Sequence, residues 1–140
     1  MVKVGINGFG RIGRLILRAI LENYKNKIQV VAINDLGSIE TNAHLIKYDS
    51  THGIINEDIQ TSKDGFKIGN QEIKVFAEKD PANIPWGKIG VDVVLECTGI
   101  FLDKTSAEKH GDTNSSSNCR NEYFEKKSPK RISIYISSFI

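Results

Sequence analysis

The spacing of apolar residues changes twice within the first 34 positions of the chain. Residues 2–7 are a short run rich in β-branched side chains, and residues 28–34 are almost continuously apolar. Between these runs, apolar residues recur at helical steps of 3, 4, 7 and 8 from Ile12. This pattern predicts a strand, a helix ending near Asn23 and a second strand covered on both faces, joined by a right-handed crossover.

The predicted helix divides into an apolar side and a charged side. The apolar positions at helical spacing are Ile12, Leu15, Ile16, Ala19 and Ile20. The charged positions, at i, i+4 steps on another face, are Arg14, Arg18 and Glu22. Such a division is typical of an amphipathic helix.

Further along, the pattern predicts shorter elements. Strands are expected over 58–62, 66–68 and 72–76, because Asp64-Gly65 and Gly69-Asn70 are strong hairpin turns. We also expect a short helix over residues 40–48 and a further strand over residues 91–96. A last helix is expected to run to residue 110, with Asp103 as its N-cap. The order of elements predicts an α/β fold in which a β-meander is inserted.

A glycine-rich turn joins the first predicted strand to the helix. It reads Gly8-Phe9-Gly10-Arg11-Ile12-Gly13, and since glycine is 12 of the 140 residues, this spacing alone is weak. The context strengthens it, because the turn lies between a strand and a helix in one βαβ unit. The sequence therefore predicts a Rossmann-type, doubly wound, mostly parallel sheet that binds a dinucleotide.

Each position of the turn has a physical task. Gly8 allows the tight turn, Gly10 lets the backbone approach a pyrophosphate, and Gly13 lets the helix pack closely on the strand. The phosphates are then expected to meet the N–H groups of Arg11 and Ile12 at the positive end of the helix.

An acidic residue follows the second strand at the expected distance. Asp35 comes 22 residues after Gly13, close to the spacing of about 20 at which a carboxylate binds the adenosine ribose. Such a carboxylate repels a 2′-phosphate, so we expect NAD to be preferred over NADP. The alternative is a glycine-rich turn beside a surface aspartate that binds nothing.

Residues 1–110 also resemble a known family in several segments that occur in order. The segments are Ile6–Arg14, Ile33–Leu36, Leu45–Gly53, Ala77–Pro81, Trp86-Gly87 and Glu96–Phe101. Together they resemble the N-terminal domain of glyceraldehyde-3-phosphate dehydrogenases, glycolytic enzymes that oxidise an aldehyde to an acyl phosphate while NAD accepts a hydride. The resemblance implies a Rossmann domain for NAD in a cytoplasmic oxidoreductase whose relatives form homotetramers.

The resemblance also assigns roles to single residues. It implies that Arg11 and Ile12 contact the pyrophosphate, that Asp35 contacts the ribose, and that Thr98 and Gly99 lie along the dinucleotide. It further implies that Lys79, where relatives more often carry arginine, lies beside the adenine, although a lysine in a polar loop is commonly only solvated. The predicted cofactor-binding residues are Gly8, Phe9, Gly10, Arg11, Ile12, Gly13, Asp35, Lys79, Thr98 and Gly99.

No catalytic residue is predicted. The family's chemistry needs a cysteine thiolate in a Ser-x-Cys-Thr-x-Asn segment and a histidine base, and this chain contains no such segment. We interpret Cys97 as a small, half-buried strand residue. The residues around Cys119 do not match the Ser-x-Cys-Thr-x-Asn segment. The three histidines, His44, His52 and His110, are unconvincing bases, and the two cysteines lack the spacing of a zinc site.

Composition excludes several classes of function. A net charge of +2 with 26% charged residues predicts no binding to nucleic acid. The apolar runs are too short to cross a membrane or to form a signal peptide, and two cysteines suit a reducing cytoplasm.

The chain changes character after His110. Residues 1–110 hold 14 basic and 14 acidic residues, whereas residues 111–140 carry the whole net charge, seven serines and no Ala, Val or Leu. We therefore expect an incomplete NAD-binding domain over 1–110, a divergent, poorly ordered tail over 111–140 and no catalytic domain. Either a reading-frame change or a natural flexible linker would produce such a tail. Apolar and polar residues alternate over Arg131–Ser137, which predicts a strand that either pairs at a sheet edge or stays unpaired and prone to aggregation.

Three functions remain open from the sequence. The first is an NAD-binding fragment of a glyceraldehyde-3-phosphate dehydrogenase that is inactive alone. The second is a non-catalytic module that senses NAD or joins an intact dehydrogenase, which a co-purifying full-length partner would support. The third is the functionless product of a frame-shifted gene, which absence of the protein from its cell would support.

Overall fold

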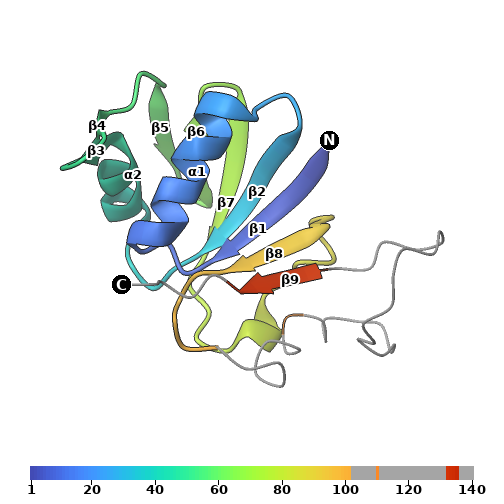
Figure 1. Ribbon diagram of the computed structural model, residues 1–140. Coiled ribbons are helices and arrows are strands. Elements are labelled where there is room, and N and C mark those ends of the chain that lie inside the picture. Colours follow the sequence, from blue (N-terminus) through green and yellow to red (C-terminus); the bar gives the residue numbers. More distant parts are fainter. Residues whose placement is uncertain (102–109, 111–131, 136–140) are drawn as a thin grey trace.

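The protein is described by a computed structural model that covers residues 1–101, 110 and 132–135 (Figure 1). Its helices are α1 (Arg11–Asn23), α2 (Ile39–Lys47) and a short 3-10 helix, η1 (Pro81–Asn83). Its strands are β1 (Val2–Asn7), β2 (Ile28–Asn34), β3 (Tyr48–Asp49), β4 (Gly53–Ile54), β5 (Ile59–Ser62), β6 (Gly65–Ile68), β7 (Gln71–Phe76), β8 (Val93–Glu96) and β9 (Ile132–Tyr135).

The central sheet has the strand order β5-β6-β7-β2-β1-β8-β9. Strands β7, β2, β1, β8 and β9 run parallel to one another, whereas β5 pairs antiparallel with β6 and β6 pairs antiparallel with β7. The chain moves outward from β1 to β2 on one side and later returns to place β8 on the other side of β1. This confirms the predicted α/β class, with a doubly wound, mostly parallel sheet and an inserted meander.

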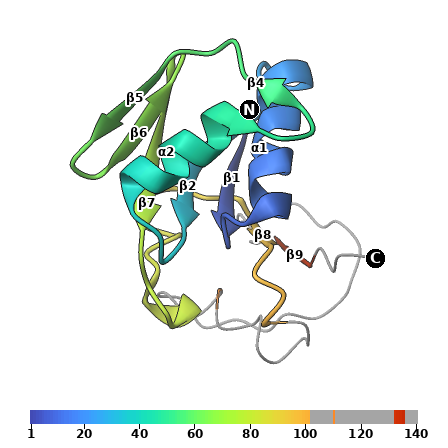
Figure 2. The same ribbon diagram turned by 90° about the vertical axis from the view of Figure 1, so that its left-hand side faces the viewer.

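Two apolar layers enclose the parallel strands. On one face, α1 and α2 cover a core that includes Ile6, Leu17, Ile33 and Ile46 (Figures 1 and 2). On the other face, the segment that follows η1 brings Trp86 onto the sheet beside Ala32 and Val94. A sheet covered on both faces accounts for the nearly continuous apolar runs of β2 and β8.

The predicted hairpins form where the turn residues place them. β5 and β6 pair from Ile59 with Ile68 to Ser62 with Gly65, and β6 and β7 continue the antiparallel pairing. Gly69 has a φ of +54°, a left-handed conformation that glycine adopts without strain. The predicted helix over 40–48 is also present as α2, and the side chain of Ser38 accepts a hydrogen bond from Thr41 N at its start.

The predicted faces of α1 are partly wrong. The helix ends at Asn23 as expected, but its buried residues are Gly13, Leu17, Arg18, Ile20 and Leu21. Ala19 is exposed, and Leu15 and Ile16 are only half-buried. Residues 15–21 are all apolar except Arg18, so the periodicity fits more than one rotation of the helix.

Arg18 is buried because it serves as a hydrogen-bond donor inside the fold. Its Nε donates to Ile46 O at 3.1 Å, and its Nη2 donates to Lys47 O at 3.1 Å and to Gly53 O at 2.7 Å. The last carbonyl groups of a helix have no partner within it, and a guanidinium can satisfy several of them at once. Arg18 thereby fixes the end of α2 against α1.

The end of the chain contributes one described strand. β9 pairs in parallel with β8, from Val93 with Ile132 to Glu96 with Tyr135, and forms the edge of the sheet (Figure 1). The expected strand within Arg131–Ser137 therefore pairs at a sheet edge. The predicted helix from Asp103 and most of the tail lie outside the described residues, so the expected poor order of 111–140 stays a prediction.

Candidate cofactor-binding site

The loops that hold the predicted site residues lie along one edge of the sheet. Four parallel strands, β7, β2, β1 and β8, end at this edge because they run in the same direction. The loops that follow them carry Lys79, Asp35, the glycine turn and Thr98-Gly99, in that order across the sheet. The fold therefore places all the predicted residues at the carboxyl edge, where open α/β sheets bind ligands.

The glycine turn is packed tightly between α1 and the loop after β8. Gly8 has a φ of +89°, and a Cβ at this position would lie 2.7 Å from Thr98 N. A Cβ on Gly13 would lie only 2.3 Å from Gly8 O. Gly8 must be glycine because its φ is left-handed and Thr98 leaves no room for a Cβ, and Gly13 must be glycine because α1 approaches Gly8 O closely.

Gly10 differs, because space lies open around it. An added Cβ would have no atom from beyond the two adjoining residues within 4 Å, and the φ of −69° at Gly10 suits any residue. Gly10 is the N-cap of α1, where no side chain caps the helix and no acidic residue occupies the first turn. The start of α1 thus presents backbone N–H groups and the positive end of a helix dipole to an open space.

Asp35 connects two of the loops at this edge. Its Oδ2 accepts a hydrogen bond from Phe9 N at 2.9 Å, and its Oδ1 accepts one from Gly37 N at 2.8 Å. A carboxylate can accept about four hydrogen bonds, so each oxygen keeps a lone pair for a ligand. Asp35 is only half-buried, so part of the residue is exposed to solvent.

The remaining predicted residues occupy the two ends of the edge. Lys79 is exposed and follows Glu78, whose backbone N–H and C=O are both hydrogen-bonded to the side chain of Asn34. At the other end, Thr98 is half-buried and Gly99 has a φ of +73° with open space around it. The edge therefore exposes the side chain of Lys79 at one end and the backbone of Gly99 at the other.

Sequence patterns alone did not single out the buried polar residues beneath these loops. Asn7, Asn34 and Glu96 each end a parallel strand, and each is buried. Every one follows an isoleucine or a leucine at the end of an apolar run. A polar residue at that position is the signal that could have identified them.

Cys97 has the properties of a structural cysteine. Its backbone N–H donates to Asn7 O at 2.7 Å, and its side chain packs against the core. Burial, together with the negative charge of Glu96, raises the pKa of the Cys97 thiol to about 12. This environment suppresses the thiolate that a nucleophilic cysteine requires.

The thiol of Cys97 should therefore react very slowly with iodoacetamide. At pH 8 a thiol of this pKa carries roughly a thousandfold less thiolate than an ordinary cysteine. The rate is measured by mass spectrometry of the peptide that contains Cys97, with the chain in denaturant as the control. Native labelling within tenfold of the denatured rate would contradict this expectation.

The three histidines lie in different surroundings, and the rings of two of them, His52 and His110, face a carboxylate. His52 Nδ1 lies 3.1 Å from Asp49 Oδ1 in an exposed turn, and hydrogen bonds from the backbone N–H groups of His52 and Thr51 hold the Asp49 pKa well below its usual range. The ring of His44 packs on Tyr48 at the surface. His110 is buried against Trp86 and Glu96, away from solvent.

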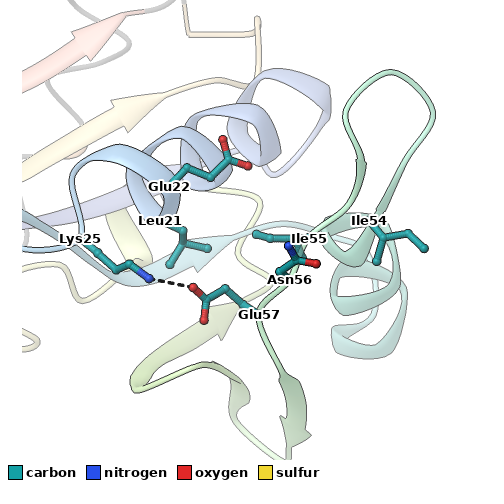
Figure 3. A pocket seen from close by; sticks show the side chains of 7 residues that line it. All are labelled: Leu21, Glu22, Lys25, Ile54, Ile55, Asn56 and Glu57. Atoms are coloured by element: carbon teal, nitrogen blue, oxygen red, sulfur yellow. Dashed lines mark hydrogen bonds and ion pairs between the residues drawn. The ribbon is translucent and has the colours of Figure 1, made fainter.

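A surface hollow lies at the opposite end of α1 from the glycine turn. It has a volume of about 180 Å³ and is lined by Leu21, Glu22, Lys25 and residues 54–57, where Lys25 Nζ and Glu57 Oε1 form an ion pair at 2.9 Å (Figure 3). It shares no residue with the predicted site. In the described part of the chain there is also no cluster of three metal-ligating side chains.

None of the helices described in the structure is long and apolar enough to cross a membrane. The longest of them, α1, has 13 residues, and its exposed side carries charged side chains.

Comparisons with known proteins agree with the geometry of the site. A family model described as "Glyceraldehyde 3-phosphate dehydrogenase, NAD binding domain" matches residues 2–104. Glyceraldehyde-3-phosphate dehydrogenase of Clostridium pasteurianum is 56% identical over 110 residues, which are 79% of this chain and 32% of that protein. Glyceraldehyde-3-phosphate dehydrogenase 1 of Bacillus cereus is 52% identical over 110 residues, with the same coverage of both chains.

A eukaryotic relative gives the same result. Glyceraldehyde-3-phosphate dehydrogenase 1 of Kluyveromyces lactis is 52% identical over 113 residues, which are 80% of this chain and 34% of that protein. The chain spans about a third of the length of the curated relatives it matches. These findings confirm the resemblance seen in the motifs, and they support NAD as the cofactor. The chain belongs to the glyceraldehyde-3-phosphate dehydrogenase family, of which it carries the NAD-binding domain.

Proposed function

We propose that the chain binds NAD in an extended conformation along the carboxyl edge of β7, β2, β1 and β8. The observation that carries this proposal is the open space over Gly10, directly at the uncapped N-terminus of α1. A pyrophosphate in that space would accept hydrogen bonds from the N–H groups of Arg11 and Ile12. Phe9 and Gly8 form the turn beneath it, and Gly13 keeps α1 close to that turn.

The order of the loops across the sheet supports one direction for the cofactor. Asp35 lies on the β2 side of the glycine turn, where its free lone pairs suit the hydroxyls of the adenosine ribose. Lys79 lies farther out in the same direction, next to the position proposed for the adenine. Thr98 and Gly99 lie on the opposite side of the turn and would line the nicotinamide half.

When bound, NAD supplies the hydride acceptor of a dehydrogenase reaction. The residues of this edge bind and orient the cofactor, and we assign none of them to bond making or proton transfer. We further propose that the chain does not carry out the aldehyde oxidation of the family on its own, that it resides in the cytoplasm and that it binds no nucleic acid.

Titration calorimetry of the whole chain with NAD, and separately with NADP, tests the proposed function. We expect saturable binding of NAD with one site per chain and much weaker binding of NADP. The absence of heat with both nucleotides at millimolar concentration would refute the proposal.

Replacing Asp35 with alanine should weaken NAD binding by about tenfold or more. It should also reduce the difference in affinity between NAD and NADP. Hydrogen bonds to a charged group contribute about 1.5–3 kcal/mol, and 1.4 kcal/mol corresponds to tenfold in affinity. The same calorimetric titrations measure the effect. Asp92→Ala is the matched control, because Asp92 Oδ2 also accepts a backbone N–H, from Lys3 at 2.9 Å, but at the amino edge of the sheet. Equal losses in both variants would contradict a ribose-binding role for Asp35.

A further inference from the structure

A continuous row of side-chain hydrogen bonds runs beneath the carboxyl edge of the sheet. Asn34 Nδ2 donates to Asn7 Oδ1 at 2.8 Å, and Asn7 Nδ2 donates to Glu96 Oε2 at 2.6 Å. These residues are register partners on adjacent strands, since Asn7 pairs with both Asn34 and Glu96. Each is 5% exposed or less. The row therefore links the ends of three parallel strands from inside the fold.

The direction of the row is fixed at both of its ends. At one end, Glu78 N donates to Asn34 Oδ1, so the amide group of Asn34 must point its nitrogen toward Asn7. At the other end, Asn7 meets a carboxylate, which only accepts hydrogen bonds. Both amides are thus oriented head to tail toward Glu96, an arrangement in which successive hydrogen bonds polarise one another.

Glu96 is surrounded by donors on both of its oxygens. Oε2 accepts from Asn7 and lies 2.8 Å from His110 Nε2. Since Trp86 Nε1 donates to His110 Nδ1, the proton of that ring lies on Nε2 and points at Glu96. Desolvation raises the pKa of Glu96, but the hydrogen bonds from His110, Thr98 and Asn7 outweigh it, so the pKa lies below its ordinary value. The site is built for an ionised carboxylate.

The second oxygen of Glu96 holds the loop that we assign to the nicotinamide half. Thr98 N donates to Oε1 at 2.8 Å, and the Thr98 hydroxyl donates to the same oxygen. The hydroxyl in turn accepts from Ile100 N at 3.1 Å. Thr98 also packs on Gly8, where an added Cβ would lie 2.7 Å from Thr98 N and 2.8 Å from Thr98 Cγ2. The turn over residues 98–100 is therefore fixed between a buried anion and the glycine turn.

We infer that Glu96 is a positioning residue for the cofactor, whose carboxylate sets the conformation of the Thr98–Ile100 turn against the nicotinamide half of NAD. This inference rests on the proposed function. The row through Asn7 and Asn34 holds that carboxylate in place from the adenine side. Glu96 lies beneath the turn, so it acts through Thr98 and does not touch the cofactor.

Glu96→Gln tests the inference because it preserves shape and removes one acceptor. All the groups around Glu96 donate, so a glutamine NH2 must face a donor on one side. Binding is measured by titration calorimetry of the full chain with NAD and with AMP, which carries only the adenosine half. We expect the Kd for NAD to rise at least tenfold and the Kd for AMP to stay within twofold.

Thr98→Val is the second variant, and it tests the positioning role of Glu96 if Glu96→Gln does not fold. It keeps the backbone N–H bond to Glu96 but removes the hydroxyl that links Glu96 to Ile100 N. We expect at least a threefold rise in the Kd for NAD, again with AMP within twofold. Thermal melting of each variant without ligand shows whether it is folded.

The outcomes separate this inference from the proposed function. If the unaltered chain fails to bind NAD, the proposed function is wrong. If the unaltered chain binds NAD and the folded variants bind it equally well, the inference alone is wrong. Equal losses for NAD and AMP would also overturn it, because a general loss of structure affects both halves of the site.

Discussion

Replacing Gly10 with alanine should remove most NAD binding and leave the fold intact. The new methyl group would enter the open space at the start of α1, where no protein atom beyond the two adjoining residues lies within 4 Å of it. A pyrophosphate bound there would lose its close approach to two backbone N–H groups, each worth about 1.5–3 kcal/mol to a charged ligand. We therefore expect NAD affinity to fall by roughly a hundredfold or more in titration calorimetry.

Stability should change little in the same variant. The backbone of Gly10, with φ −69° and ψ −161°, is accessible to alanine. Alanine is a poorer N-cap than glycine, but it also lowers the entropy of the unfolded chain, and these effects of up to about 1 kcal/mol oppose each other. Chemical denaturation measures the result.

Gly90→Ala is the matched control with the opposite expectation. Gly90 has a φ of +72° and lies before β8, at the amino edge of the sheet. Left-handed backbone costs alanine about 1–2 kcal/mol of stability, whereas the cofactor edge is untouched. If Gly10→Ala retains full NAD affinity, the pyrophosphate does not lie over the start of α1.

Replacing Gly13 with alanine should destabilise the fold by about 1 kcal/mol or more. The added Cβ would lie 2.3 Å from Gly8 O, a backbone atom that cannot move without shifting the glycine turn. Overpacking of this kind costs typically about 1–3 kcal/mol and occasionally more. The gain in helix propensity from glycine to alanine, about 1 kcal/mol, is too small to offset a large clash.

The sign of the change in stability decides this prediction. Urea denaturation of the whole chain gives the free energy of unfolding for the unaltered protein and for Gly13→Ala. Helix propensity alone predicts a more stable variant, so any stabilisation would show that α1 does not need close contact with the turn. Ala19→Gly, at an exposed position of α1, measures the propensity effect without the clash.

The elements that the sequence predicted well are those encoded by neighbouring residues. The change from strand to helical periodicity located β1, α1 and β2, and the glycines at 65 and 69 located the hairpins of β5, β6 and β7. Strand ends follow from the same patterns, so the common edge of the predicted site residues could be anticipated. Such signals need no knowledge of how distant segments meet.

The features that escaped prediction depend on contacts between distant segments. Arg18 is buried because the carbonyl groups of residues 46, 47 and 53 need a donor, and nothing near residue 18 indicates this. Asn7 and Glu96 are 89 positions apart, and their pairing follows only from the order of the strands. The helical period could not show which apolar face of α1 packs on the sheet. The close approach of Gly13 to Gly8 O determines that face, and it involves the tertiary structure.

The position of β1 in the middle of the sheet also sets the order in which the domain can be completed during synthesis. Its two neighbours are β2, which begins at residue 28, and β8, which begins at residue 93. A chain emerging from the ribosome can pair β1 with β2 long before β8 exists, so one side of β1 stays without a strand partner until late. The part of the cofactor edge formed by the loop after β8, with Thr98 and Gly99, is therefore completed later than the part that carries the glycine turn and Asp35.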